Sequence, residues 1–248
     1  MNKENVLFSI VGVLVGFIVG FVFANTANRA GMAPQAGAAP ATQQVEGLPE
    51  GHPAIDPSQM KPKVDEAALA AAAKLADDQA DNFAAQANAA GLSVQAGRYD
   101  DGVKYYTRAN KVKPDDYETL VELGNTLFDS EKLADAEKWY TAALAKNPKD
   151  VNVRTDLGLT FLLREPAQYE RAIAEFKRSL ELEPTHPQTL QNLTVAYTRK
   201  GDIAGAEATL AKLRAASPQS PSIEQLRAAI DKARASTPSE TSAVKAEK

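Results

Sequence analysis

Residues that could do acid-base, nucleophilic or metal chemistry are few in this sequence and lie far apart. The chain has no cysteine and only two histidines, His52 in a proline-rich stretch and His186 beside Pro187. A zinc site needs three or four ligands and a Ser-His-Asp triad needs its members in contact, so two isolated imidazoles favour neither. The sequence also has no glycine-rich phosphate loop. We therefore predict that the protein is not an enzyme and has no metal site and no cofactor.

The charged residues predict a solvated surface and do not indicate a nucleic-acid partner. The 28 basic and 32 acidic residues are scattered along the chain and give a formal net charge of -4. Binding to DNA or RNA needs a basic patch that neutralises phosphates, which this distribution does not provide. Acidic pairs such as Asp77-Asp78 and Asp115-Asp116 fall at helix starts or solvent-facing positions, where helix capping explains them.

Residues 6–24 form an apolar run that predicts a membrane-spanning helix behind a short flank, residues 1–5. The run has 19 residues without a charge, and Ser9 is its only polar side chain. As a helix it would extend roughly 28 Å, which matches the hydrocarbon core of a bilayer. Because cleavable signals have shorter apolar cores of about 7 to 15 residues, we favour a retained anchor over cleavage after Ala24.

The flanks of this run indicate its orientation only weakly. Lys3 precedes the run, Arg29 follows it, and the next basic residue is Lys61. Because positive charge collects on the cytoplasmic side of a membrane, Lys3 and the terminal amine favour a cytoplasmic N-terminus. We therefore expect the larger part of the chain to lie outside the cytoplasm.

Gly12, Gly16 and Gly20 recur every four residues within the apolar run. This spacing places all three on one helix face and lets another helix approach closely, as in GxxxG pairing. Glycine is also common in membrane helices that do not pair in this way. The sequence therefore leaves open whether this face packs against a second copy, packs against another membrane protein, or has no specific partner.

Two segments lack the apolar pattern of a packed core. Residues 25–63 are rich in Ala, Gly, Gln and Pro, and prolines at positions 34, 40, 49, 53, 57 and 62 disfavour helix and strand. We predict a disordered linker there, with an end-to-end distance on the order of 35 Å as a flexible coil. Residues 235–248 are mainly polar and charged, and we predict a disordered tail.

Self-comparison of the remaining segment shows a repeat of about 34 residues. Prolines mark its boundaries, with spacings of 34, 36 and 34 residues between Pro114, Pro148, Pro184 and Pro218. In step with them, a small residue is followed four residues later by a bulky one. These pairs are Gly102 and Tyr106, Ala136 and Tyr140, Ala172 and Phe176, and Ala206 and Leu210. Small residues let paired helices approach and bulky ones fill the space between them, so the repeat predicts stacked helical hairpins.

The pattern resembles the tetratricopeptide repeat, whose 34-residue unit combines Leu-Gly, an aromatic residue, alanines and proline. The copy at residues 117–150 fits best, through Leu120, Leu123, Gly124, Leu127, Ala136, Tyr140, Ala143 and Pro148. The resemblance implies an all-α fold, a right-handed α-solenoid of about four helix hairpins. It also implies a protein-binding function, of the membrane-anchored bacterial type.

Four units follow from the repeat, and one helix flanks them on each side. The first unit, residues 83–116, is degenerate because Ala89, Ala90 and Ser93 replace Leu, Gly and Tyr. The second and fourth units are residues 117–150 and 187–220. The third, residues 151–186, has a two-residue insertion that should lengthen the turn between its helices. An Ala-rich helix at 64–82 and a capping helix at 221–234 complete the predicted array.

The resemblance also implies where a partner would bind, because stacked hairpins of this family form a concave face from their first helices. The side of each first helix opposite its Leu-Gly positions should line that groove. Counting by three and four along units two to four gives Glu118, Val121, Asn125, Phe128, Asn152, Thr155, Leu159, Leu162, Gln188, Gln191, Val195 and Thr198. Apolar and amide side chains dominate this set, which suits an extended peptide or a helix as ligand.

These observations favour a membrane-anchored scaffold or assembly factor that binds a protein partner in the groove. The alternative is a structural component that associates with itself through the glycine face and the repeat array. The expected location is the bacterial inner membrane, as a single-pass protein whose repeat domain lies in the periplasm.

Overall fold

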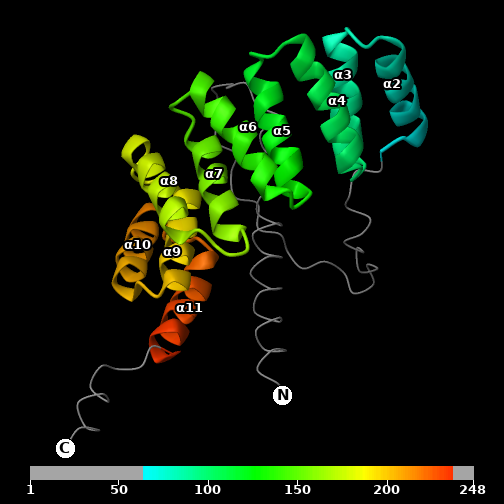
Figure 1. The fold of residues 1–248 in the computed structure, drawn as a ribbon. Helices are drawn as coiled ribbons and strands as arrows, with labels where there is room; N and C mark the ends of the chain where they lie inside the picture. Colours follow the sequence, from blue (N-terminus) through cyan, green and yellow to red (C-terminus); the bar gives the residue numbers. More distant parts are fainter. Residues whose placement is uncertain (1–63, 237–248) are drawn as a thin grey trace, which may run out of the picture. The chain divides into compact units, whose positions relative to one another are not determined.

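The computed structural model describes residues 64–236, which form ten α-helices and no β-strand (Figure 1). The helices are α2 (Glu66–Asp78), α3 (Phe83–Gln95), α4 (Tyr99–Val112), α5 (Tyr117–Asp129), α6 (Leu133–Lys146), α7 (Val151–Leu163), α8 (Tyr169–Leu182), α9 (Pro187–Lys200), α10 (Ile203–Ala216) and α11 (Ser222–Ser236). The prediction of an all-α fold is confirmed for these residues.

The predicted membrane helix at 6–24, with Gly12, Gly16 and Gly20, lies outside the described residues, as do the predicted linker and residues 237–248 of the tail. Within the described part, every helix is too short or too polar to cross a bilayer. The membrane anchor therefore stays a prediction from the sequence.

Four helical hairpins follow one another along the described chain. α3 pairs with α4, α5 with α6, α7 with α8, and α9 with α10, and the second helix of each of the first three hairpins also packs against the first helix of the next hairpin (Figure 1). α2 packs on α3 at one end, and α11 packs on α9 and α10 at the other. This order confirms a solenoid of four hairpins with flanking helices.

Polar side chains fix the starts of the first helices. Asp116 precedes α5 and Asp150 precedes α7, and each carboxylate accepts a hydrogen bond from a backbone N–H in the first helical turn. Such a cap contributes about 1 kcal/mol because it satisfies an N–H that has no partner within the helix. Proline ends the second helices, as where Pro148 follows the C-cap residue Asn147 of α6.

The bulky and small residues of the repeat pack together between paired helices. Tyr140 of α6 and Phe176 of α8 are fully buried. A Cβ atom added to Gly124 of α5 would lie 2.6 Å from the Tyr140 ring, and one added to Gly158 of α7 would lie 2.6 Å from the Phe176 ring. The Leu-Gly positions are therefore glycine because an aromatic ring occupies the place of a side chain.

The third hairpin contains the longer turn that the insertion predicts. Residues 164–168 separate α7 from α8, whereas residues 130–132 separate α5 from α6. Arg164 in the longer turn and Arg171 of α8 both form ion pairs with Glu137 of α6, with N–O distances of 2.5 Å. Both guanidinium groups also lie over the Phe161 ring. The inserted residues are thus held against the preceding hairpin.

The flanking helices lie within or near the predicted segments. α2 occupies only Glu66–Asp78 of the predicted 64–82 segment, and α11 extends to Ser236, beyond the predicted end at 234. The degenerate first unit still forms a complete hairpin. Gln86 of α3 is buried and donates a hydrogen bond from Nε2 to the Ala76 carbonyl oxygen of α2, 2.5 Å away, which ties α2 to this hairpin.

Candidate partner-binding face

The twelve residues predicted to line a groove lie on α5, α7 and α9, four on each helix. Their spacing of three and four residues places each set of four on one side of its helix. We call the twelve together the first-helix face. This face is less accessible in the structure than the sequence predicts, and more of it is buried on α7 than on α5.

On α5, much of the first-helix face is accessible. Glu118 is exposed, Asn125 and Phe128 are half-buried, and Val121 is buried. The Asn125 Oδ1 atom accepts a hydrogen bond from the Tyr140 hydroxyl at 3.0 Å. Because this bond occupies the amide oxygen, the Asn125 NH₂ group is the donor that the side chain can offer to a peptide backbone.

On α7, most of the first-helix face is buried. Leu159 and Leu162 are each 1% exposed, Thr155 is fully buried, and only Asn152 is half-buried. The reason is that α7 packs against α6, α8 and α9, so its neighbours cover more than one side of the helix. Leu159 and Leu162 therefore belong to the core of this structure, and their contact with a partner stays a prediction.

The buried Thr155 side chain forms hydrogen bonds inside the array. Its Oγ1 atom lies 2.6 Å from Oγ1 of Thr189 on α9 and donates a hydrogen bond to the Val151 carbonyl oxygen at 2.7 Å. Thr189 Oγ1 also lies 2.7 Å from His186 Nδ1. This buried chain of polar groups links the first helices of two neighbouring hairpins. Sequence reasoning missed it, because the two-residue insertion puts the two threonines at different positions of their repeats, so the repeat does not pair them.

On α9, the first-helix face is covered except near the end of the helix. Gln188, Gln191 and Val195 are buried. Thr198 is half-buried, and its hydroxyl donates a hydrogen bond to the Thr194 carbonyl oxygen at 2.8 Å. The amides on this helix are therefore less available to a ligand than the sequence predicted.

The accessible part of the first-helix face is polar with one aromatic contact. Its exposed or half-buried members are Glu118, Asn125, Phe128, Asn152 and Thr198. Amides and a hydroxyl can bond the backbone of a peptide, and an aromatic ring can cover one apolar side chain. Within residues 64–236, no group of three or more acidic or histidine side chains is placed to hold a metal ion. The groups that this face offers are hydrogen-bond donors and acceptors and one aromatic ring.

The start of α5 carries negative charge close to α4. Burial raises the pKa of the Tyr106 hydroxyl, and the charges of Glu122 and Glu118 raise it further. The same field that opposes ionisation of Tyr106 opposes the approach of a carboxylate.

Comparisons with known proteins agree with this architecture. Two family models, both described as tetratricopeptide repeat, match residues 92–151 and 163–230. No curated protein matches the sequence.

Solved structures with the same fold include three that cover most of the described residues. YrrB, described as a TPR protein with an unusual peptide-binding site, has 20% identity and a TM-score of 0.58 over 65% of this chain and 82% of YrrB. PilW, described as a widely conserved type IV pilus biogenesis factor, has 20% identity and a TM-score of 0.57 over 67% of this chain and 76% of PilW. A chain described as MamA 41-end from Desulfovibrio magneticus RS-1 has 20% identity and a TM-score of 0.57 over 63% of this chain and 87% of that chain. Likeness at this identity shows the fold.

Proposed function

Because residues 92–151 and 163–230 are tetratricopeptide repeats, we propose that this protein is a membrane-anchored scaffold or assembly factor. In this proposal the first-helix face binds a peptide or a helix of a protein partner. The observation that carries it is the stack of four hairpins, which presents side chains of successive first helices to one ligand. An extended peptide can bond such a face through its backbone and be selected through its side chains.

Proteins of the same fold support binding in preference to catalysis. YrrB is described as having a peptide-binding site and PilW as a pilus biogenesis factor. Neither description names a reaction. Transfer of a binding function to this chain rests on the shared architecture, and the partner is set by side chains that differ between these proteins.

The accessible side chains define the kind of segment that fits. Phe128 supplies the apolar contact, Asn125 and Asn152 supply hydrogen-bond donors, and Glu118 supplies negative charge. We infer a neutral or basic segment with one bulky apolar residue as ligand. A segment that ends in a carboxylate would be repelled by Glu118 and Glu122.

Binding is tested by co-purifying protein partners with the full chain in detergent micelles. The variant Phe128→Ala with Asn152→Arg should reduce the yield of co-purified partner at least tenfold. It removes the aromatic contact and places a positive charge at the half-buried position 152. Thr141→Arg on the exposed surface of α6 is the matched control and should leave the yield unchanged. Equal recovery of the same partners by both variants and the wild type would refute binding at this face.

The anchor and the compartment are part of the proposal and have their own test. The apolar run at 6–24 and the charge bias from Lys3 support a single-pass protein of the bacterial inner membrane with the repeats in the periplasm. Alkaline phosphatase fused after residue 248 is active only outside the cytoplasm, so we expect activity in the membrane fraction. A full-length fusion without activity would indicate the opposite orientation, with the repeats in the cytoplasm. Activity in a soluble fraction would indicate cleavage.

Self-association is the second candidate function, favoured by the spacing of Gly12, Gly16 and Gly20. It predicts an oligomer of the full chain in detergent that light scattering detects. Gly16→Leu should then convert this oligomer to a monomer, whereas Gly51→Leu in the following segment should not. A monomeric wild-type chain would exclude this candidate while leaving partner binding intact.

A further inference from the structure

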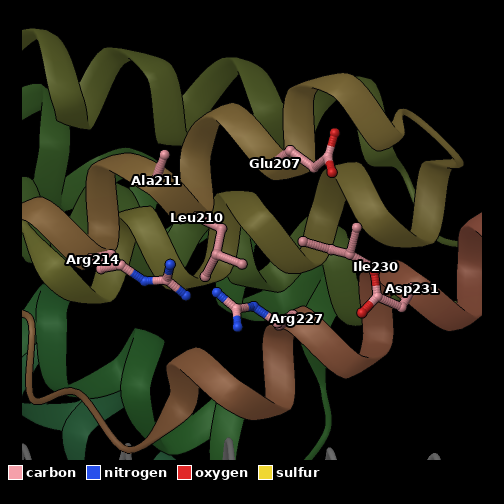
Figure 2. A pocket seen from close by; sticks show the side chains of 7 residues that line it. All are labelled: Glu207, Leu210, Ala211, Arg214, Arg227, Ile230 and Asp231. Atoms are coloured by element: carbon pink, nitrogen blue, oxygen red, sulfur yellow. The ribbon is translucent and has the colours of Figure 1, made fainter.

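A cleft of about 240 Å³ lies between α10 and α11 at the C-terminal end of the array (Figure 2). Two arginines mark one end, with their guanidinium groups directed toward each other, and two acidic residues mark the other end. Apolar side chains lie between them. The lining residues are Glu207, Leu210, Ala211, Arg214, Arg227, Ile230 and Asp231, and we call them the end cleft.

The repeat explains why this place is open. Counting 34 residues on from α9, Arg227 of α11 takes the position of Leu193, and Asp231 takes the position of Tyr197. Leu193 is buried, and a Cβ atom added to Gly205 of α10 would lie 2.9 Å from the Tyr197 ring, so Tyr197 packs against the second helix of its own hairpin. The described residues contain no helix after α11 to pack in the same way. Charged residues at both positions keep this side of α11 suited to water or to a polar ligand.

The ion pairs at the two ends of the end cleft are unequal. Arg234 forms ion pairs with both acidic residues, Glu207 and Asp231. At the other end, Arg214 and Arg227 share one carboxylate, that of Glu224, at 4.0 and 3.8 Å. Glu224 is 76% exposed, and exposed pairs at such distances contribute little. Arg214 and Arg227 therefore hold the Glu224 carboxylate weakly, and water or another carboxylate can take its place beside their guanidinium groups.

We propose that the end cleft binds an acidic segment of a protein partner. A glutamate or aspartate of that segment displaces Glu224 and is held by Arg214 and Arg227, because guanidinium groups bond carboxylates through paired N–H donors. A neighbouring apolar side chain of the segment covers Leu210 and Ile230 at the floor. This site lies on other helices than the first-helix face, and it selects the opposite charge.

The test uses the full chain in detergent micelles and a fluorescein-labelled peptide of repeated Glu-Glu-Leu, capped at both ends. Fluorescence anisotropy should show binding that weakens as salt is added, since the charges are exposed and screened. The matching Gln-Gln-Leu peptide should bind at least tenfold more weakly. Arg214→Gln with Arg227→Gln should lower the affinity for the acidic peptide at least tenfold, and Glu224→Gln should raise it severalfold.

Controls decide whether the effect belongs to this cleft. Arg178→Gln removes an exposed arginine of α8 that also has an acidic neighbour, and it should leave the affinity unchanged. Equal losses with Arg178→Gln and with the double variant would overturn the proposal, as would equal binding of the two peptides. A chain ending at Ser236 should bind as the full chain does. A tenfold gain on that truncation, dependent on Arg214 and Arg227, would assign the cleft to residues 237–248 and overturn binding of a partner.

Discussion

Gly124 and Gly91 are both helical glycines, but only Gly124 has an aromatic ring where its side chain would be. A Cβ atom at Gly124 would lie 2.6 Å from two carbon atoms of the Tyr140 ring. Tyr140 is buried and its hydroxyl bonds Asn125, so the ring cannot move aside without losing contacts. We expect Gly124→Ala to lower the free energy of unfolding by about 1–3 kcal/mol, measured by urea denaturation.

Gly91→Ala is the matched control for this prediction. A Cβ atom there would meet only the Tyr106 hydroxyl oxygen at 3.8 Å, an ordinary contact. Because alanine favours helix over glycine, the free energy of unfolding should stay the same or rise by about 0.5–1 kcal/mol. Equal destabilisation by both substitutions would contradict the packing explanation, since only one site is crowded.

Sequence spacing predicts contacts within a hairpin better than burial between hairpins. The pairing of Gly124 with Tyr140 follows from the repeat because both residues lie in one unit. The burial of Leu159 does not follow, because it depends on three neighbouring helices whose approach no local pattern specifies. The end cleft could have been predicted, since the repeat places Arg227 where Leu193 is buried in the preceding unit.

At the scale of elements, Glu137 joins three helices through one carboxylate. It lies on α6 and accepts charged hydrogen bonds from Arg164 after α7 and from Arg171 of α8. Partial burial by itself raises the pKa of Glu137, but the hydrogen bonds from Arg171 and Arg164 outweigh it and hold the pKa below its usual value. The carboxylate form is therefore favoured by folding.

Glu137→Gln should lower the free energy of unfolding by roughly 1–2 kcal/mol at pH 7, because charged hydrogen bonds are replaced by neutral ones. A lowered pKa in the folded state stabilises the protein above the unfolded pKa of about 4.3. The difference between wild type and variant should therefore persist from pH 7 to 5 and vanish as the pH falls through the lowered pKa. Urea denaturation across this pH range measures it.

Glu183→Gln controls for the general effect of removing a negative charge. Glu183 is exposed at the end of α8, and its substitution should change the free energy of unfolding by less than about 0.5 kcal/mol. A difference between wild type and Glu137→Gln that grows as the pH falls would have the wrong sign and would reject the assigned role of Glu137.

At the scale of the whole molecule, the described helices contact mainly their neighbours in sequence, so stability should vary along the array. α2 packs mainly on α3, its Asp77 carboxylate bonds Tyr105 and Arg108 of α4, and its Leu75 is 44% exposed. α7 and α9 lie between neighbours on several sides and bury most of their residues. Loss of α2 breaks its packing on α3 and the exposed polar contacts of Asp77 with α4, whereas opening α7 breaks packing against α6, α8 and α9.

We therefore expect amide hydrogen exchange of the full chain in detergent to be fastest in α2, and slowest in α7 and α9. Mass spectrometry of peptides from each helix measures the rates. Leu69→Ala, which removes a buried side chain of α2, should speed exchange in α2 while leaving α7 unchanged. In a linear array each helix contacts only its neighbours, so destabilising α2 should not reach α7. Equal acceleration of exchange in both helices would instead show that residues 64–236 open as one cooperative unit.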